Sequence, residues 1–171
     1  MTESKPAQTR TLPKTKRAFQ NAIIGWFAEN AEDYPWRRTH DPYAVLVSEL
    51  MLQQTQVATV LGRRYFERWL EQFPDVSALA GATEEEVLKA WEGLGYYRRA
   101  RNLHKAAQTV VEEFDGEFPY VLADILSLPG VGRYTAGAVA SFAFDQSAAI
   151  VDANVARVLA RLFDFGGEVD S

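Results

Sequence analysis

The sequence contains no cysteine among its 171 residues and only two histidines, His40 and His104. Without thiols these residues can form no disulfide, perform no thiol chemistry and hold no cysteine-ligated metal or iron-sulfur cluster. The two histidines lie far apart in the sequence, which argues against a histidine-rich metal site. We therefore expect no metal ligands and no cofactor bound by this chain.

Long apolar runs and a positive net charge are also missing. No uninterrupted apolar stretch approaches the roughly 20 residues that span a bilayer, and the polar N-terminus lacks the apolar segment of a signal peptide. We therefore expect no membrane partner and a cytoplasmic (intracellular) location. The net charge of −5 differs from that of domains that coat nucleic acid nonspecifically, which are usually basic.

A local basic surface remains compatible with this net charge, although a charged cluster is more often only a solvated helix face. The candidates are one cluster near the N-terminus and one in the middle of the chain: Lys14, Lys16 and Arg17, and Arg98, Arg99, Arg101 and Lys105.

Apolar residues recur at helical spacing from about Lys16 onward, and no convincing alternating strand pattern appears. The first helix is predicted to end near Asn30. Asp41 can cap a second helix with Pro42 in its first position, and an apolar stripe then continues to Val57. We predict an all-α fold with short connections, comprising one domain or one domain and part of another.

Further along, Thr83 and Glu86 have the spacing of a capping box. The segment 128–136 (LPGVGRYTA) joins two predicted helices in a hairpin over residues 124–142. Its glycines allow a close approach of the backbone to another molecule, and the following helix presents unpaired N–H groups, so a phosphate fits there. An ordinary helix-helix turn with a glycine cap explains the same glycines equally well.

Two carboxylates, Asp152 and Glu49, each have an ordinary structural explanation when they are considered alone. Asp152 precedes an apolar helix, where an aspartate is most simply an N-cap. Glu49 lies at the edge of the apolar stripe, with Gln53 one turn further on, and a glutamate there is most simply a solvated boundary residue.

Taken in order, several segments resemble DNA glycosylases of the helix-hairpin-helix superfamily, and within it adenine glycosylases of the MutY type: residues 35–37 (PWR), 48–57 (SELMLQQTQV), 93–103 (GLGYYRRARNL), the hairpin, and 150–158 (IVDANVARV). The resemblance implies a six-helix barrel over residues 35–147 with the hairpin at 124–142. It also implies a second helical domain of the iron-sulfur type, incomplete here, to which residues 16–34 and the truncated 148–171 belong. Residues 1–15 are expected to form a disordered tail.

The resemblance further implies a repair enzyme that flips adenine out of a mispair with 8-oxoguanine or guanine and hydrolyses its N-glycosidic bond. The expected partner is duplex DNA containing such a mispair, bound by a monomer. Tyr134 occupies the position where relatives with lyase activity carry a lysine, so we expect a monofunctional glycosylase. The alternatives are a mismatch thymine or uracil glycosylase and a noncatalytic DNA-binding module. Members of this family usually continue into helices with four cysteines that hold a [4Fe-4S] cluster.

By the same resemblance, Glu49 protonates the flipped base, Asp152 stabilises the cationic sugar, and Tyr134 and Asn154 position these groups. Partly apolar surroundings are expected to raise the pKa of Glu49. Gln54 and Tyr96 are the candidates for filling the gap left by the extruded nucleotide, with core packing as the alternative for Tyr96. The full set of residues expected to contact DNA or the base is Arg37, Leu52, Gln53, Gln54, Thr55, Tyr96, Arg101, Leu128, Gly130, Val131, Gly132 and Arg133.

Overall fold

A computed structural model describes residues 15–167. Within this range all of the regular secondary structure is helical, which confirms the predicted fold class. The elements are α1 (Lys16–Asn30), η1 (Pro35–Arg37, a 3-10 helix), α2 (Pro42–Leu52), α3 (Val57–Gly62), α4 (Tyr65–Gln72), α5 (Val76–Ala80), α6 (Glu84–Ala90), α7 (Arg98–Glu113), α8 (Leu122–Ser127), α9 (Arg133–Phe144) and α10 (Ala153–Leu162).

The chain divides into two compact units between Tyr34 and Pro35. The first unit contains α1, which ends at Asn30 as predicted and is capped by the Thr15 hydroxyl accepting from the Ala18 amide at 3.2 Å. The tail predicted for residues 1–15 falls, apart from Thr15, outside the described residues. The assignment of a barrel and of a second domain stays a prediction.

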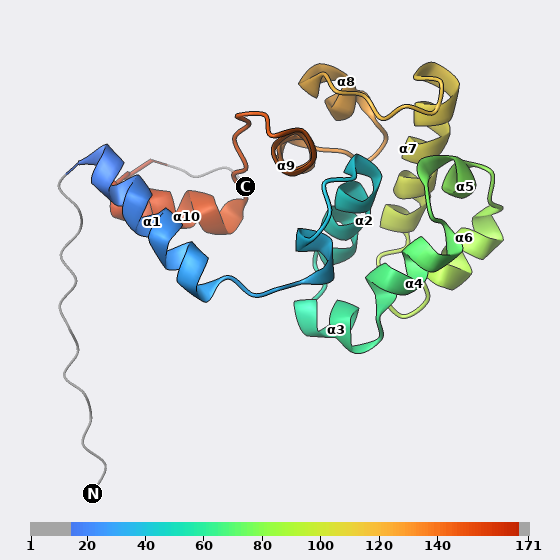
Figure 1. Ribbon diagram of the computed structural model, residues 1–171, viewed down its shortest axis with the longest axis horizontal. Helices are drawn as coiled ribbons and strands as arrows, with labels where there is room; N and C mark the ends of the chain where they lie inside the picture. Colours follow the sequence, from blue (N-terminus) through green and yellow to red (C-terminus); the bar gives the residue numbers. More distant parts are fainter. Residues whose placement is uncertain (1–14, 168–171) are drawn as a thin grey trace, which may run out of the picture. The chain divides into compact units, whose positions relative to one another are not determined.

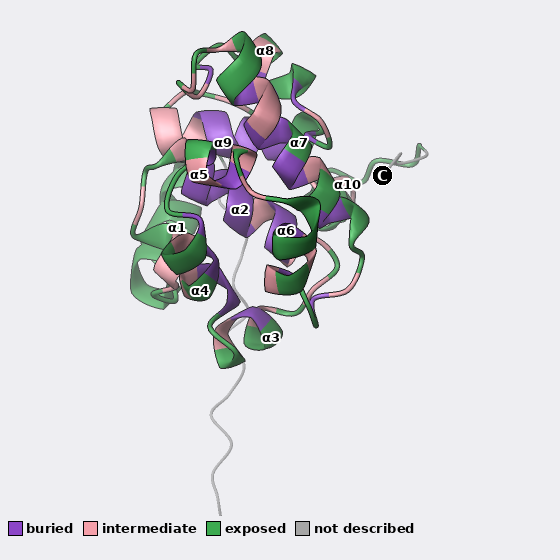
Figure 2. Ribbon diagram, turned by 90° about the vertical axis from the view of Figure 1, so that its right-hand side faces the viewer, coloured by how far each residue is buried: buried purple, intermediate pink, exposed green. Residues whose placement is uncertain are grey.

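In the second unit, α2 lies between α9 and α7 and is the central helix of the core (Figure 1). Eight of its eleven residues are buried, because α2 is apolar on nearly all sides and not on one stripe only. Figure 2 shows the same concentration of buried residues where α2, α7 and α9 meet. α10 has no buried residue. None of the helices in residues 15–167 has the length and apolar character needed to cross a membrane.

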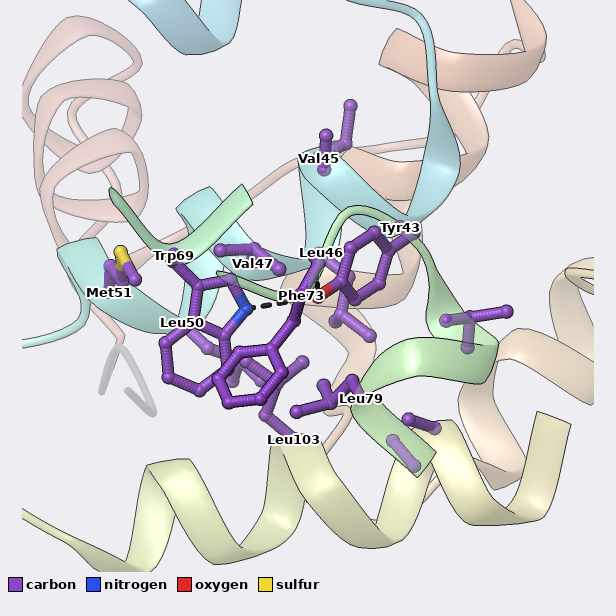
Figure 3. Close-up of a cluster of buried hydrophobic side chains, with 14 of the residues drawn as sticks. Tyr43, Val45, Leu46, Val47, Leu50, Met51, Trp69, Phe73, Leu79 and Leu103 are labelled. Atoms are coloured by element: carbon purple, nitrogen blue, oxygen red, sulfur yellow. Dashed lines mark hydrogen bonds between the residues drawn. The ribbon is translucent and has the colours of Figure 1, made fainter. Parts of the chain in front are cut away.

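Two polar side chains in the middle of this core, Tyr43 and Trp69, are hydrogen-bonded to each other. The Trp69 indole N–H donates to the Tyr43 hydroxyl at 3.0 Å, and that hydroxyl donates to the carbonyl oxygen of Phe73 at 2.9 Å (Figure 3). Trp69 also packs edge-on against Trp91, with ring centroids 5.4 Å apart. A buried polar group with a partner avoids the desolvation penalty that an unpaired one incurs. These contacts therefore fix α4 against α2.

The caps predicted from the sequence are confirmed, but one helix is shorter than predicted. Asp41 accepts from the amides of Tyr43 and Ala44 ahead of Pro42, and the capping box at α6 is complete. The apolar stripe, however, does not continue in one helix to Val57. α2 ends at Leu52, Gln54 adopts a left-handed conformation (φ 54°), and Val57 begins α3. The spacing of apolar residues does not reveal this break.

The hairpin between α8 and α9 depends on Gly130. Its φ is +77°, and a Cβ built there would lie 2.5 Å from the Cβ of Asn102 on α7. We therefore expect Gly130→Ala to lower the free energy of unfolding by about 1 to 3 kcal/mol, because the left-handed backbone and the contact with Asn102 both oppose a side chain.

The matched control is Gly132→Ala in the same hairpin. Gly132 has a negative φ of −91°, and a Cβ there meets nothing within 4 Å, so its effect should stay within about 0.5 kcal/mol. Urea unfolding of both variants measures the difference. Equal stabilities would show that Gly130 does not hold the hairpin against α7.

Candidate active site

The centre of the candidate site is Glu49, on the last turns of α2. Its carboxyl group is mostly withdrawn from solvent and accepts a hydrogen bond from the Tyr134 hydroxyl. Burial raises the pKa of Glu49 to about 7, and the bond from Tyr134 offsets only part of that rise. The predicted rise in its pKa is confirmed. At neutral pH a substantial fraction of Glu49 is protonated and can donate a proton.

Tyr134 lies near both Glu49 and a second carboxylate, that of Asp152. It lies in the first turn of α9, and its pKa is raised to about 12 by burial and by the negative charges of Glu49 and Asp152. The phenol therefore stays neutral near neutrality and acts as a hydrogen-bond donor. Two carboxylates that are distant in sequence thus lie within electrostatic range of one hydroxyl.

Gly137, in α9, allows the segment that leads to Asp152 to pass close to this helix. A Cβ built on Gly137 would lie 2.5 Å from the carbonyl oxygen of Ala149. Only a glycine lets the segment before Asp152 cross α9 so closely. The missing side chain at Gly137 therefore allows this crossing.

Asp152 is both an N-cap and the second carboxylate of the site. One of its oxygens accepts from the Val155 amide at 2.7 Å, and the other accepts from the Asn154 side-chain amide at 3.1 Å. These bonds, with the nearby Arg157, hold the pKa of Asp152 below its usual value. Asp152 is therefore ionised at every pH at which Glu49 titrates.

A groove with a volume of about 730 Å³ lies between the residues that follow α2 and those at the start of α7. Gln54 and Tyr96 line it together with Gln53 and Arg101. Tyr96 is 64% exposed, so the core-packing alternative for this residue is wrong. The Gln53 side chain donates to the hydroxyl of Thr135 at 3.4 Å, which links the groove to the helix that carries Tyr134.

The remaining predicted contact residues fall into two groups. Gly130, Gly132 and Arg133 are exposed on the hairpin, whereas the side chains of Leu128 and Val131 are buried, so those two can offer only their backbone. The others do not line the groove: Arg37 is exposed in η1, Leu52 packs partly against the core, and Thr55 is half-buried.

Arg99 does not belong to a solvated basic face. Arg98, Arg101 and Lys105 are exposed, but Arg99 is only 8% exposed, and its guanidinium is bonded to backbone oxygens of the loops around the groove. This inward orientation was not predicted from the sequence. The same holds for Asn102, whose side chain lies against Gly130.

No group of three or more histidine, aspartate or glutamate residues in the range 15–167 is arranged to hold a metal ion. Because the 171 residues also lack cysteine, the thiolate ligands that an iron-sulfur cluster requires are not supplied by this chain.

The comparison with known proteins defines the class of this chain. Residues 47–168 match the model of the HhH-GPD superfamily base excision DNA repair protein. The chain belongs to this superfamily.

Within it, the chain is similar to adenine DNA glycosylases, as the resemblance to the MutY type predicted. The protein of this name from Homo sapiens is 47% identical over 163 residues, which cover 90% of this chain and 30% of the human protein. The one from Mycolicibacterium smegmatis is 44% identical over 81% of this chain and 47% of its own length. The chain thus spans less than half of these curated relatives.

Solved structures show the same fold. A thermostable thymine-DNA glycosylase superposes with a TM-score of 0.78 at 32% identity, covering 84% of this chain and 65% of that one. A non-covalent complex of endonuclease III with DNA superposes with a TM-score of 0.71 at 27% identity, covering 87% and 69%.

Proposed function

We propose that this chain carries the catalytic site of an adenine DNA glycosylase, which removes adenine mispaired with 8-oxoguanine or guanine from duplex DNA. The observation that carries the proposal is the pair Glu49 and Asp152 around Tyr134. One carboxyl group has a pKa near 7 and the other a pKa below its usual value. Two carboxylates whose pKa values are driven apart are suited to act as acid and as anion in one reaction.

The first step is extrusion of the adenine nucleotide, because its glycosidic bond is inaccessible inside the duplex. A mispaired base gives up the least pairing energy on leaving the stack. Tyr96 is exposed in the groove and can wedge between base pairs, while the Gln54 amide can hydrogen-bond the base left behind. No side chain caps α9 at Gly132, so its first-turn amides are available to DNA phosphates.

The second step is hydrolysis. Protonated Glu49 donates its proton to N7 of the flipped adenine, so that the base leaves as a neutral molecule with the electron pair of the glycosidic bond. The sugar gains oxocarbenium character, which the negative charge of Asp152 stabilises. Water then attacks the anomeric carbon, and the ionised Glu49 takes up its proton. Tyr134 and Asn154 keep the two carboxylates oriented.

Tyr134 also bears on whether the enzyme has a lyase activity. A phenol cannot form the imine that a lysine forms with the sugar, so we propose a monofunctional enzyme. Borohydride should trap no covalent protein-DNA product, and a trapped product would refute this part of the proposal.

The competing activity is removal of thymine or uracil from mismatches, which the similarity to a thymine-DNA glycosylase favours. Base release from duplexes containing A opposite 8-oxoguanine and T opposite G decides between them. We expect release of adenine and little release of thymine; the reverse would assign the chain to the other specificity. No release from either duplex, with intact DNA binding, would favour the noncatalytic module.

We further propose that the protein acts as a monomer on chromosomal DNA inside the cell. The cysteine ligands that a [4Fe-4S] cluster would require are not among these 171 residues.

A further inference from the structure

The Arg99 guanidinium, in the first turn of α7, binds six oxygen atoms in two separate segments: residues 50–55, which are the end of α2 and the loop after it, and residues 94–95 in the loop before α7. Nη1 donates to the carbonyl oxygens of Leu50 at 2.8 Å and Met51 at 3.1 Å, and to that of Gln53. Nη2 donates to the Thr55 hydroxyl at 3.1 Å and to the carbonyl oxygens of Leu94 at 3.1 Å and Gly95 at 3.2 Å. One side chain therefore joins the end of α2 to the turn before α7.

The first of these loops needs such a partner. Because α2 stops at Leu52, the carbonyl groups of Leu50 and Met51 in its last turn receive no amide from a following helical turn. They also form the negative end of the helix dipole, where a cation is favourable. The buried positive charge of Arg99 satisfies both requirements at Leu50 and Met51.

The second feature is backbone strain on both sides of the groove. Gln54 and Tyr96 adopt left-handed conformations, with φ of 54° and 47°. Such conformations are costly for residues with a side chain and persist only where the surroundings hold them. Arg99 binds the carbonyl groups of Gln53 and Gly95, which immediately precede these two residues. Its Cζ also lies 5.5 Å from the centroid of the Tyr96 ring.

We propose that Arg99 is a positioning residue, which holds Gln54 and Tyr96 together in the arrangement that enters DNA. This role rests on the proposed function, in which these two side chains fill the gap left by the flipped nucleotide. Arg99 itself touches neither base nor sugar. It acts by fixing the peptide groups before both residues, so that neither side chain has to be ordered when DNA binds.

A lysine could not take this role. The guanidinium is planar and presents donors in a rigid fork, whereas an ammonium group is a single point with three donors. Arg99→Lys therefore keeps the charge and the aliphatic stem but cannot bind both loops at once. The matched control is Arg68→Lys, the same substitution at an exposed position of α4.

The first test needs no DNA. The amides of Thr55 and Leu94 are bonded within the two loops, to the carbonyl oxygens of Leu52 and Trp91. In Arg99→Lys we expect their hydrogen exchange to accelerate by about tenfold or more, while exchange of the Phe114 amide at the far end of α7 stays unchanged. Unchanged exchange at Thr55 and Leu94 would overturn the proposal, and so would equal acceleration at Phe114, which would indicate a general loss of stability.

The second test measures extrusion, with 2-aminopurine placed beside the adenine of an A:8-oxoguanine duplex. At saturating protein we expect Arg99→Lys to lower the fluorescence increase and the single-turnover rate by about tenfold to a hundredfold, with a nearly unchanged Kd and with Arg68→Lys like the wild type. Wild-type extrusion and rate in Arg99→Lys would refute the positioning role. A wild-type protein that extrudes no adenine would instead refute the proposed function, and the exchange test would still decide whether Arg99 fixes the two loops.

Discussion

Replacing Glu49 with glutamine is expected to slow adenine release in a single turnover by about 10² to 10⁴-fold, because glutamine is similar in size but cannot donate the proton that makes adenine a neutral leaving group. The measurement is release of adenine from an A:8-oxoguanine duplex with protein in excess. DNA binding should change little, since Glu49 acts on the base after extrusion.

The pH dependence follows from the same residue. The pKa of Glu49 is raised from 4.5 to about 7, so the protonated acid predominates below pH 7 and disappears above it. The wild-type rate should therefore be nearly constant between about pH 5 and 6.5 and fall by up to tenfold per pH unit above 7. Glu49→Gln should remove this dependence. A wild-type rate that rises through pH 7 would contradict the role of Glu49 as the acid.

Thermal unfolding supplies the control. Because folding raises the pKa of Glu49, its contribution to stability is complete below the unfolded value of 4.5 and is lost as the pH rises through 7. Glu49→Gln carries no charge to bury, so relative to the wild type it should gain stability between pH 5 and pH 8. A variant that is inactive because it unfolds would show the opposite.

The sequence predicts the helical elements well where local chemistry determines them. Asp41 and the pair Thr83 and Glu86 lie at helix starts, where their side chains bond the first amides. The break after Leu52 could not be predicted in this way. It is maintained by Arg99, a residue far along the chain, through bonds to backbone oxygens that leave no pattern in the sequence around Gln54.

The sequence nevertheless contains one indication that Arg99 is buried. Arg99, Leu103, Ala106 and Val110 have the 4-3-4 spacing of one helix face, and all four are buried. The apolar stripe of α7 thus continues into an arginine, which indicates a buried cation with partners. The exposed Arg98 and Arg101 on either side give this stretch the pattern of a solvated basic cluster, which hides the burial of Arg99.

The sequence predicts which residues form the candidate site, but not how they are arranged in space. Glu49 and Asp152 stand in recognisable segments, but their proximity depends on long-range packing of α9 against α2 and on the close crossing at Gly137. The direction of the Glu49 pKa shift follows from apolar surroundings in the sequence. Its size, and the bond from Tyr134, depend on tertiary structure.

Asp152→Asn separates the two roles of Asp152. Asparagine is as good an N-cap as aspartate, so the bond to the Val155 amide can persist and α10 keeps its start. Only the negative charge is lost. We expect single-turnover adenine release to fall by about 10² to 10³-fold, the range typical of removing one electrostatic contribution to a charged transition state, with little change in thermal stability.

The pH profile distinguishes this loss from that in Glu49→Gln. Bonds from Val155 and Asn154 keep the pKa of Asp152 below its usual value, so its charge is constant from pH 5 to pH 9. Asp152→Asn should therefore lower the rate by the same factor throughout this range and leave the fall above pH 7 in place. Asp152→Ala, which removes cap and charge together, should lose stability by about 1 kcal/mol as well. If Asp152→Asn keeps the wild-type rate, the negative charge does not stabilise the sugar, and Asp152 is a helix cap alone.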